Sequence, residues 1–180
     1  TRYFNCAASL LEAMRQEVEG ECEPAKSLEE LQDRAKEFIG GQIRKTAADL
    51  VGGWEHRAKH GCMPFASCII DDCLDVGLDH DRGGCRYAWV ENSFVGLANL
   101  TDAVIAVDEL VFRTGEMTVS EFYAICQANF EGHEPLRQRI LNDLPSYGND
   151  DDRADAVAVE WADFLCDTSE SCIVAGKPFV

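Results

Sequence analysis

Residues 83–103 read GGCRYAWVENSFVGLANLTDA and contain the clearest strand signal of the chain. After the two glycines, a run rich in aromatic and β-branched residues predicts a strand at 85–90, and residues 92–97 continue it less regularly. Apolar residues then recur at helical spacing from Leu97 to Val111, which predicts a helix. A single pair of strands in a mostly helical chain has few neighbouring strands with which to form a sheet. Either this strand assignment is therefore wrong, or the neighbouring strands lie outside this sequence.

Helical patterns fill most of the remaining chain. Ser27 and Glu30 have the spacing of a capping box and precede a long apolar stripe, which Gly40-Gly41 interrupts and is expected to kink. Thr118 and Glu121 form a second capping box. Three further helices are expected: from Pro64 to near Gly77, from Pro135, and from the acidic run at residues 149–152. We therefore predict a mostly α fold of roughly six helices with one or two strands.

Composition limits the classes of function. The chain has 180 residues, of which 46% are hydrophobic, and this proportion suits a globular protein. No stretch is long and apolar enough for a membrane span, and no secretory signal is visible. A formal net charge of −17 argues against binding to phosphate backbones. We therefore expect a cytoplasmic location and no nucleic-acid or membrane partner.

Cysteine and histidine spacing does not predict a metal site. The nine cysteines are odd in number, which favours reduced thiols, and Cys68 and Cys73 would lie about 140° apart on a helix. His56 and His60 have a usable spacing, but no Glu follows His56 in the order that a zinc enzyme needs. A calcium loop starting at Asp79 fails because Val90 stands at its twelfth position, where a bidentate Glu is required.

Five segments in register resemble one family across nearly the whole chain. They are CMPFAS with DDCLDVGLD (62–67 and 71–79), GGCRY (83–87), NSFVGLANLTDA with LVF (92–103 and 110–112), NFEGHE (129–134) and LPSYGNDD (144–151). In order and spacing they resemble the pyruvate formate-lyase-like domain of glycyl radical enzymes.

The resemblance implies a fold, namely a ten-stranded α/β barrel wrapped in helices. Residues 1–180 would be an internal part of such a domain, incomplete at both ends, supplying outer helices and about one barrel strand. We then expect apolar faces of the long helix after Ser27 or of the helix around Trp161 to be partly exposed, because their neighbours would be absent.

The resemblance also implies where the chemistry lies. In this family a cysteine loop supplies a thiyl radical and a glycine loop stores the radical, which a radical S-adenosylmethionine activase installs. Cys85 lacks the Glu expected two residues later, and Gly176 lacks the flanking Arg and Tyr of the radical loop. The catalytic cysteine is therefore expected before Thr1 and the radical glycine after Val180. We predict no catalytic residue, bound cofactor or activity in this chain alone.

The segment after Gly83-Gly84 is the candidate substrate-binding region. Strand alternation and the resemblance predict that five residues approach the barrel lumen, with alternate residues facing the substrate: Tyr87, Trp89, Glu91, Asn92 and Ser93. Alternatively, the two aromatic residues belong to the core, and the Asn and Ser cap a loop. Ala88 replaces an Asn of the family's diol and amine lyases, and residues 90–94 replace their Gly-Pro-Gln region, so diol or choline specificity is not transferred.

The parent protein is thus expected to be a radical lyase or a formate acetyltransferase of anaerobic metabolism. Its expected partners are a small-molecule substrate, the activase and a second copy in a homodimer. The alternative from another class is a stand-alone acidic helical module that binds a partner without catalysis.

Overall fold

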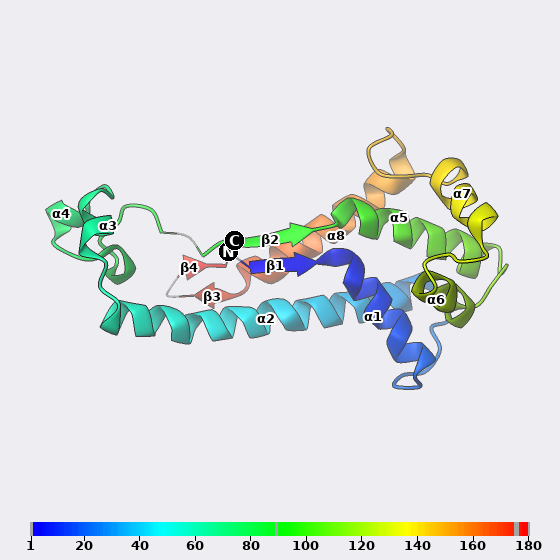
Figure 1. Ribbon diagram of the computed structural model, residues 1–180, viewed down its shortest axis with the longest axis horizontal. Coiled ribbons are helices and arrows are strands. Elements are labelled where there is room, and N and C mark those ends of the chain that lie inside the picture. Colours follow the sequence, from blue (N-terminus) through cyan, green and yellow to red (C-terminus); the bar gives the residue numbers. More distant parts are fainter. Residues whose placement is uncertain (1, 89, 175–176, 180) are drawn as a thin grey trace. The chain divides into compact units, whose positions relative to one another are not determined.

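The computed structural model describes residues 2–88, 90–174 and 177–179, and most of these residues are helical (Figure 1). The α-helices are α1 (Cys6–Val18), α2 (Leu28–His60), α3 (Pro64–Cys68), α4 (Cys73–Val76), α5 (Leu97–Val107), α6 (Val119–Gln127), α7 (Glu134–Asp143) and α8 (Asp152–Glu170). A 3₁₀ turn, η1 (His80–Arg82), and a π-helix, η2 (Asp108–Arg113), complete the helical elements. The mostly helical fold expected from the sequence is confirmed.

Four short strands make two small sheets. β1 (Arg2–Asn5) pairs with β2 (Asn92–Val95), while β3 (Ile173–Val174) pairs antiparallel with β4 (Lys177–Pro178). The strand predicted at 85–90 does not form in the described part of that range, where only Val90 makes a bridge, to Phe179, whereas the less regular continuation predicted at 92–97 contains β2. A strand forms where a partner strand offers backbone groups, and β1 offers them to 92–95.

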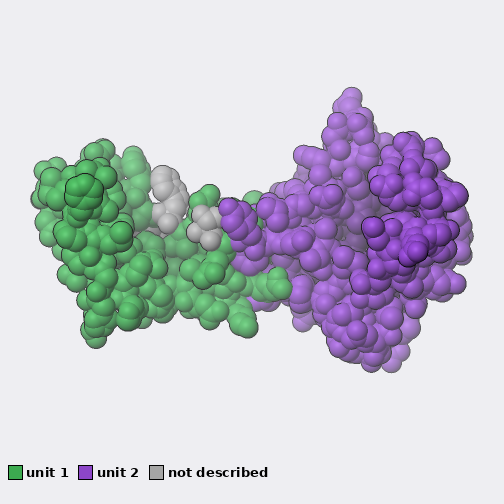
Figure 2. All heavy atoms as spheres, in the orientation of Figure 1, with its two compact units in different colours: residues 1–2, 42–93, 166–180 green, residues 3–41, 94–165 purple. Residues whose placement is uncertain are grey.

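The chain divides into two compact units (Figure 2). Unit 1 comprises residues 1–2, 42–93 and 166–180, and unit 2 comprises residues 3–41 and 94–165. Unit 1 holds the candidate substrate-binding segment together with α3, α4 and η1.

Unit 2 has a helical core in which α1 packs against α5 and α6. The apolar stripe that begins α2 faces inward, with Leu31, Ala35 and Ile39 almost fully buried. Trp161 of α8 is also fully buried. The expected partial exposure of these apolar faces is therefore wrong for Leu31, Ala35, Ile39 and Trp161, whereas Val159 of α8 is exposed.

Helix starts follow the local signals in the sequence. Thr118 accepts a hydrogen bond from the backbone N–H of Glu121, whose carboxylate accepts the backbone N–H of Thr118, so this capping box is complete. At α2, Ser27 accepts the N–H of Glu30, but the Glu30 carboxylate accepts from Lys26 instead. Both devices satisfy donors that the first helical turn would otherwise leave unpaired.

One prediction about helix continuity is wrong. α2 runs without interruption through Gly40-Gly41, so the break in its apolar stripe does not end the helix. The helix expected from Pro64 to Gly77 divides into α3 and α4, separated by Asp72, whose φ of 73° is left-handed. A helix this short gains little from its own hydrogen bonds and depends on packing of its apolar side. Ile69 is 76% exposed, so that packing is absent here.

Among the described helices, none is both long enough and apolar enough to cross a membrane.

Candidate functional site

The candidate segment begins at a glycine that no other residue can replace without a shift of the backbone. Gly84 is buried, and a Cβ atom added to it would overlap the carbonyl of Leu78. Its own N–H donates to the carbonyl oxygen of Asp79 at 3.1 Å. This close approach folds the loop before residues 85–93 back on itself and sets where the segment starts.

The carboxylate of Asp79 is the centre of this loop. Its side chain is 5% exposed and accepts hydrogen bonds from the N–H of Met63 at 2.8 Å, Oγ of Ser67 at 2.9 Å and the N–H of Asp81 at 3.1 Å. Burial by itself would raise the pKa of Asp79. These donors, with a weaker contact from the Cys62 thiol, outweigh it and lower the pKa to about 2. Asp79 is therefore ionised under ordinary conditions and ties the start of α3 to η1.

A second set of contacts fastens the loop to α2. The indole N–H of Trp54 donates to the carbonyl of Asp81 at 3.0 Å, and Arg57 Nε donates to the Asp81 carboxylate at 3.2 Å. The Asp81 side chain is 7% exposed, so this ion pair is partly shielded from water. Asp79, which the calcium-loop spacing did not fit as a ligand, and Asp81 both act as acceptors for donors of the protein itself.

An ion pair follows directly after the glycines. Arg86 donates two hydrogen bonds to the carboxylate of Asp72, at 2.7 and 2.6 Å. The guanidinium lowers the pKa of Asp72 through these bonds and through its charge. Arg86 therefore anchors one side of the candidate segment to the α3–α4 region.

The five predicted site residues differ in their surroundings. Tyr87 is 71% exposed and Glu91 is exposed, whereas Asn92 and Ser93 are half-buried in β2. Trp89 lies outside the described residues. Burial does not alternate along β2, so it does not by itself select which side chains face a substrate.

Asn92 connects the segment to the C-terminal residues. Its Nδ2 donates to the carbonyl oxygen of Phe179 at 3.3 Å, and Val90 forms a parallel bridge with the same residue. Phe179 is fully buried. The segment therefore presents an amide, a hydroxyl and a carboxylate on a backbone that is fixed at both of its ends. Such groups can orient a polar substrate by hydrogen bonds.

No metal centre is found among the described residues, in which no group of three His, Cys, Asp or Glu side chains is arranged to hold an ion. The rings of His56 and His60 lie 5.0 Å apart on α2, and both residues are exposed. Gly176, which the sequence analysis rejected as a radical site, lies outside the described residues.

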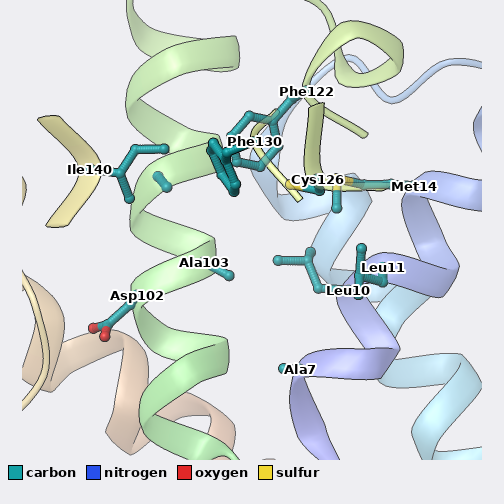
Figure 3. Close-up of a pocket in the computed structure, with 11 residues that line it drawn as sticks. Ala7, Leu10, Leu11, Met14, Asp102, Ala103, Phe122, Cys126, Phe130 and Ile140 are labelled. Atoms are coloured by element: carbon teal, nitrogen blue, oxygen red, sulfur yellow. The ribbon is translucent and has the colours of Figure 1, made fainter. Parts of the chain in front are cut away.

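Unit 2 contains an apolar cavity of about 230 Å³ between α1, α5, α6 and α7 (Figure 3). In Figure 3, Leu10 and Leu11 point toward Ala103, whereas Asp102 points away from them. Asp102 accepts the backbone N–H of Tyr147 at 2.8 Å. Burial raises the pKa of the thiol of Cys126, which also lines the cavity. A neutral thiol among apolar groups offers no acid, base or nucleophile, so this cavity is a packing feature.

Comparison with known proteins identifies the family. The family described as Pyruvate formate lyase-like matches residues 10–173. The chain belongs to the pyruvate formate lyase-like family.

This pyruvate formate lyase-like chain is similar in sequence to a curated dehydratase and in structure to a solved glycyl radical enzyme. The trans-4-hydroxy-L-proline dehydratase of Clostridioides difficile is 39% identical over 103 residues, which are 57% of this chain and 13% of that protein. A glycyl radical enzyme from Archaeoglobus fulgidus superposes with a TM-score of 0.70 at 25% identity, over 93% of this chain and 22% of that one.

The fold similarity extends over almost the whole chain. The B12-independent glycerol dehydratase from Clostridium butyricum, solved with glycerol bound, superposes with a TM-score of 0.83 over 98% of this chain, at 24% identity. This chain covers 24% of that one. The pyruvate formate lyase-like chain therefore spans about an eighth of the curated dehydratase and a quarter of the solved one.

Proposed function

We propose that this chain is an internal part of a glycyl radical enzyme that cleaves a bond in a small polar molecule. The support is the family match over residues 10–173, together with relatives that are named as dehydratases and as a glycyl radical enzyme. Within that class, elimination of water by C–O cleavage is favoured over formate acetyltransfer, because the relative that is 39% identical over 103 residues is named as a dehydratase.

The part played by this chain is structural and substrate-orienting. In the proposed parent, its helices lie outside an α/β barrel, β2 contributes to the barrel wall, and residues 1–180 are incomplete as a domain. Tyr87, Glu91, Asn92 and Ser93 approach the barrel lumen, with alternate residues facing the substrate, and Trp89, which lies outside the described residues, belongs to the same proposal. The radical lies outside this chain and is installed by a radical S-adenosylmethionine activase. It abstracts an unreactive hydrogen atom.

The contact that carries the site proposal is the one between Asn92 and Phe179. Because the Nδ2 of Asn92 lies 3.3 Å from the backbone carbonyl oxygen of Phe179, the side-chain oxygen of Asn92 has a fixed direction. A fixed acceptor suits a substrate rich in hydroxyl or charged groups, where hydrogen bonds set orientation. The parent is proposed to act in the cytoplasm of an anaerobic organism, as a homodimer.

The test begins with the complete reading frame that encodes this chain. It should contain a cysteine loop before Thr1 and a glycine loop after Val180. The complete protein, incubated under anoxia with its activase, should give a glycyl doublet in electron paramagnetic resonance, and residues 1–180 alone should give none. A reading frame confined to residues 1–180 would support the stand-alone acidic module instead, and a doublet from residues 1–180 alone would overturn the proposed division of roles.

A further inference from the structure

Two histidines lie one turn apart at the C-terminal end of α2. His56 and His60 are both exposed, and the centroids of their rings lie 5.0 Å apart with an angle of 46° between the ring planes. The turn before them contains Gly52 and Gly53, and a Cβ atom added to either glycine would meet nothing within 4 Å. Because side chains of a helix lean toward its N-terminus, the two imidazoles lean toward a turn that has no side chain to obstruct them.

The opposite side of this part of α2 is occupied by the loop around η1. Trp54 and Arg57 both donate hydrogen bonds to Asp81. The Nε of Arg82 donates to the carbonyl oxygen of Ala58 at 2.6 Å. At about 100° per residue, Trp54, Arg57 and Ala58 fall within one arc of the helix, and the two histidines fall roughly opposite that arc. The loop therefore holds this end of α2 from one side and leaves the histidine side uncovered.

The separation of the two rings fits two nitrogen ligands of one metal ion. An imidazole nitrogen binds Zn²⁺ at about 2.0–2.1 Å. When the two metal–nitrogen bonds make an angle between a right angle and the tetrahedral angle, the centroids of the two rings lie about 4.5–5.2 Å apart. The observed separation of 5.0 Å falls within this range.

We propose that His56 and His60 together bind a divalent ion of the late first transition row, the class that includes Ni²⁺, Cu²⁺ and Zn²⁺. Imidazole is a preferred ligand of these ions. No third His, Cys, Asp or Glu side chain of the described residues is arranged to join them, so water fills the other positions of the ion. The inference is independent of the proposed function, because the pair takes no part in the proposed reaction.

The position of the pair in the chain favours a cation. His60 is the last residue of α2 and His56 lies one turn before it, where the negative end of the helix dipole attracts positive charge. The net charge of −17 also raises the local concentration of cations around the chain. Once one imidazole holds the ion, the second is already close to it, so the pair binds more tightly than either ring alone.

Modification of single histidines tests the proposal in the complete polypeptide that contains this chain. Diethyl pyrocarbonate reacts with imidazole nitrogens that are free of metal, and mass spectrometry of the peptides gives the rate at each histidine. We expect Ni²⁺, at about ten times its dissociation constant, to slow the reaction of His56 and His60 about tenfold. His133, which is exposed at the start of α7, is the control and should react at an unchanged rate.

Either of two results in the wild-type polypeptide would overturn the proposal. One is that Ni²⁺ leaves the rates at His56 and His60 unchanged. The other is that both histidines react slowly without Ni²⁺, because another part of the complete polypeptide covers them and the ion has no access.

Two variants distinguish a paired site from binding to one imidazole. In His56→Ala, the Ni²⁺ concentration that protects His60 should rise at least about tenfold. The double variant Glu55→His, His56→Ala keeps two imidazoles on the helix but places them five residues and about 140° apart, and it should show the same loss. Glu55 is exposed, so this exchange leaves the packing of α2 intact. If His60 stays equally protected in both variants, the ion is an adventitious ion only and the proposed pair is wrong.

Discussion

The indole N–H of Trp161 in α8 donates a hydrogen bond to the side-chain oxygen of Gln32 in α2, with 2.8 Å between Nε1 and Oε1. Trp161 is fully buried and Gln32 is 8% exposed, although 129 positions separate them in the sequence. The bond fixes how the two helices meet, because a buried indole N–H needs an acceptor.

Replacing Gln32 by Ala should destabilise unit 2. The substitution leaves the indole N–H of Trp161 buried without this acceptor, which costs about 1–3 kcal/mol. Urea unfolding followed by tryptophan fluorescence measures the change. Gln42→Ala, at an exposed position of the same helix, should change the free energy of unfolding by less than about 0.5 kcal/mol. Equal effects of the two substitutions would mean that the bond does not contribute.

Two adjacent leucines of α1 should differ sharply when shortened. Leu10 is 1% exposed and Leu11 is 37% exposed, and both line the apolar cavity of unit 2. Leu10→Ala removes a buried side chain from the packing around the cavity and should cost about 2–5 kcal/mol. Leu11→Ala should cost less, because its side chain already contacts water. Denaturant midpoints of the two variants give the comparison, and a larger loss for Leu11→Ala would contradict the packing described here.

The Asp79 carboxylate should control the order of the loop around it. Asp79→Asn replaces one acceptor oxygen by an N–H₂ group that faces the donors from Met63 and Ser67 or from Asp81. Amide hydrogen exchange at Met63 and Asp81 should then speed up by about tenfold. Asp75→Asn, an exposed neighbour, is the matched control and should leave both rates unchanged.

Acid should remove the same stabilisation. The pKa of folded Asp79 is lowered to about 2 from an ordinary value of 3.8. Its contribution to stability is therefore fully present above about pH 4 and is lost as the pH falls toward 2. The difference in amide protection between the wild-type chain and Asp79→Asn should shrink across this window. A difference that stayed constant from pH 5 to pH 2 would show that the carboxylate charge is not what holds the loop.

Asn92 should affect substrate use more than stability in the complete enzyme. Asn92→Ala removes the amide held by the Phe179 carbonyl, and Ser93→Ala removes the neighbouring hydroxyl. We expect at least one of these variants to lower kcat/KM by about tenfold or more. Val95→Ala, at the exposed end of β2, should be nearly neutral. Kinetics at saturating and at low substrate separate KM from kcat. Unchanged values for both variants would remove these two residues from the proposed site.

Local sequence signals correctly predicted the elements whose stabilising contacts are close in the chain. Thr118 and Glu121 cap α6 from within one turn, and Pro135 stands in the first turn of α7. The acidic residues before and within the start of α8 were also predicted from their attraction to the positive end of a helix. The family segments depend on residue identities alone, so the family was recognisable before the fold was known.

The sequence by itself thus determined the family, the helical character and most helix starts. Only the tertiary structure decided that the strand lies at β2 rather than at 85–90, because a strand exists only with a partner and β1 lies about ninety residues earlier. It also decided that Asp79 acts as an acceptor, since its donors come from two separate stretches of the loop. The helix break at Asp72 was also decided by the tertiary structure. Helical periodicity in the sequence predicts a helix with one apolar side, but a short helix is stable only where another surface packs against that side.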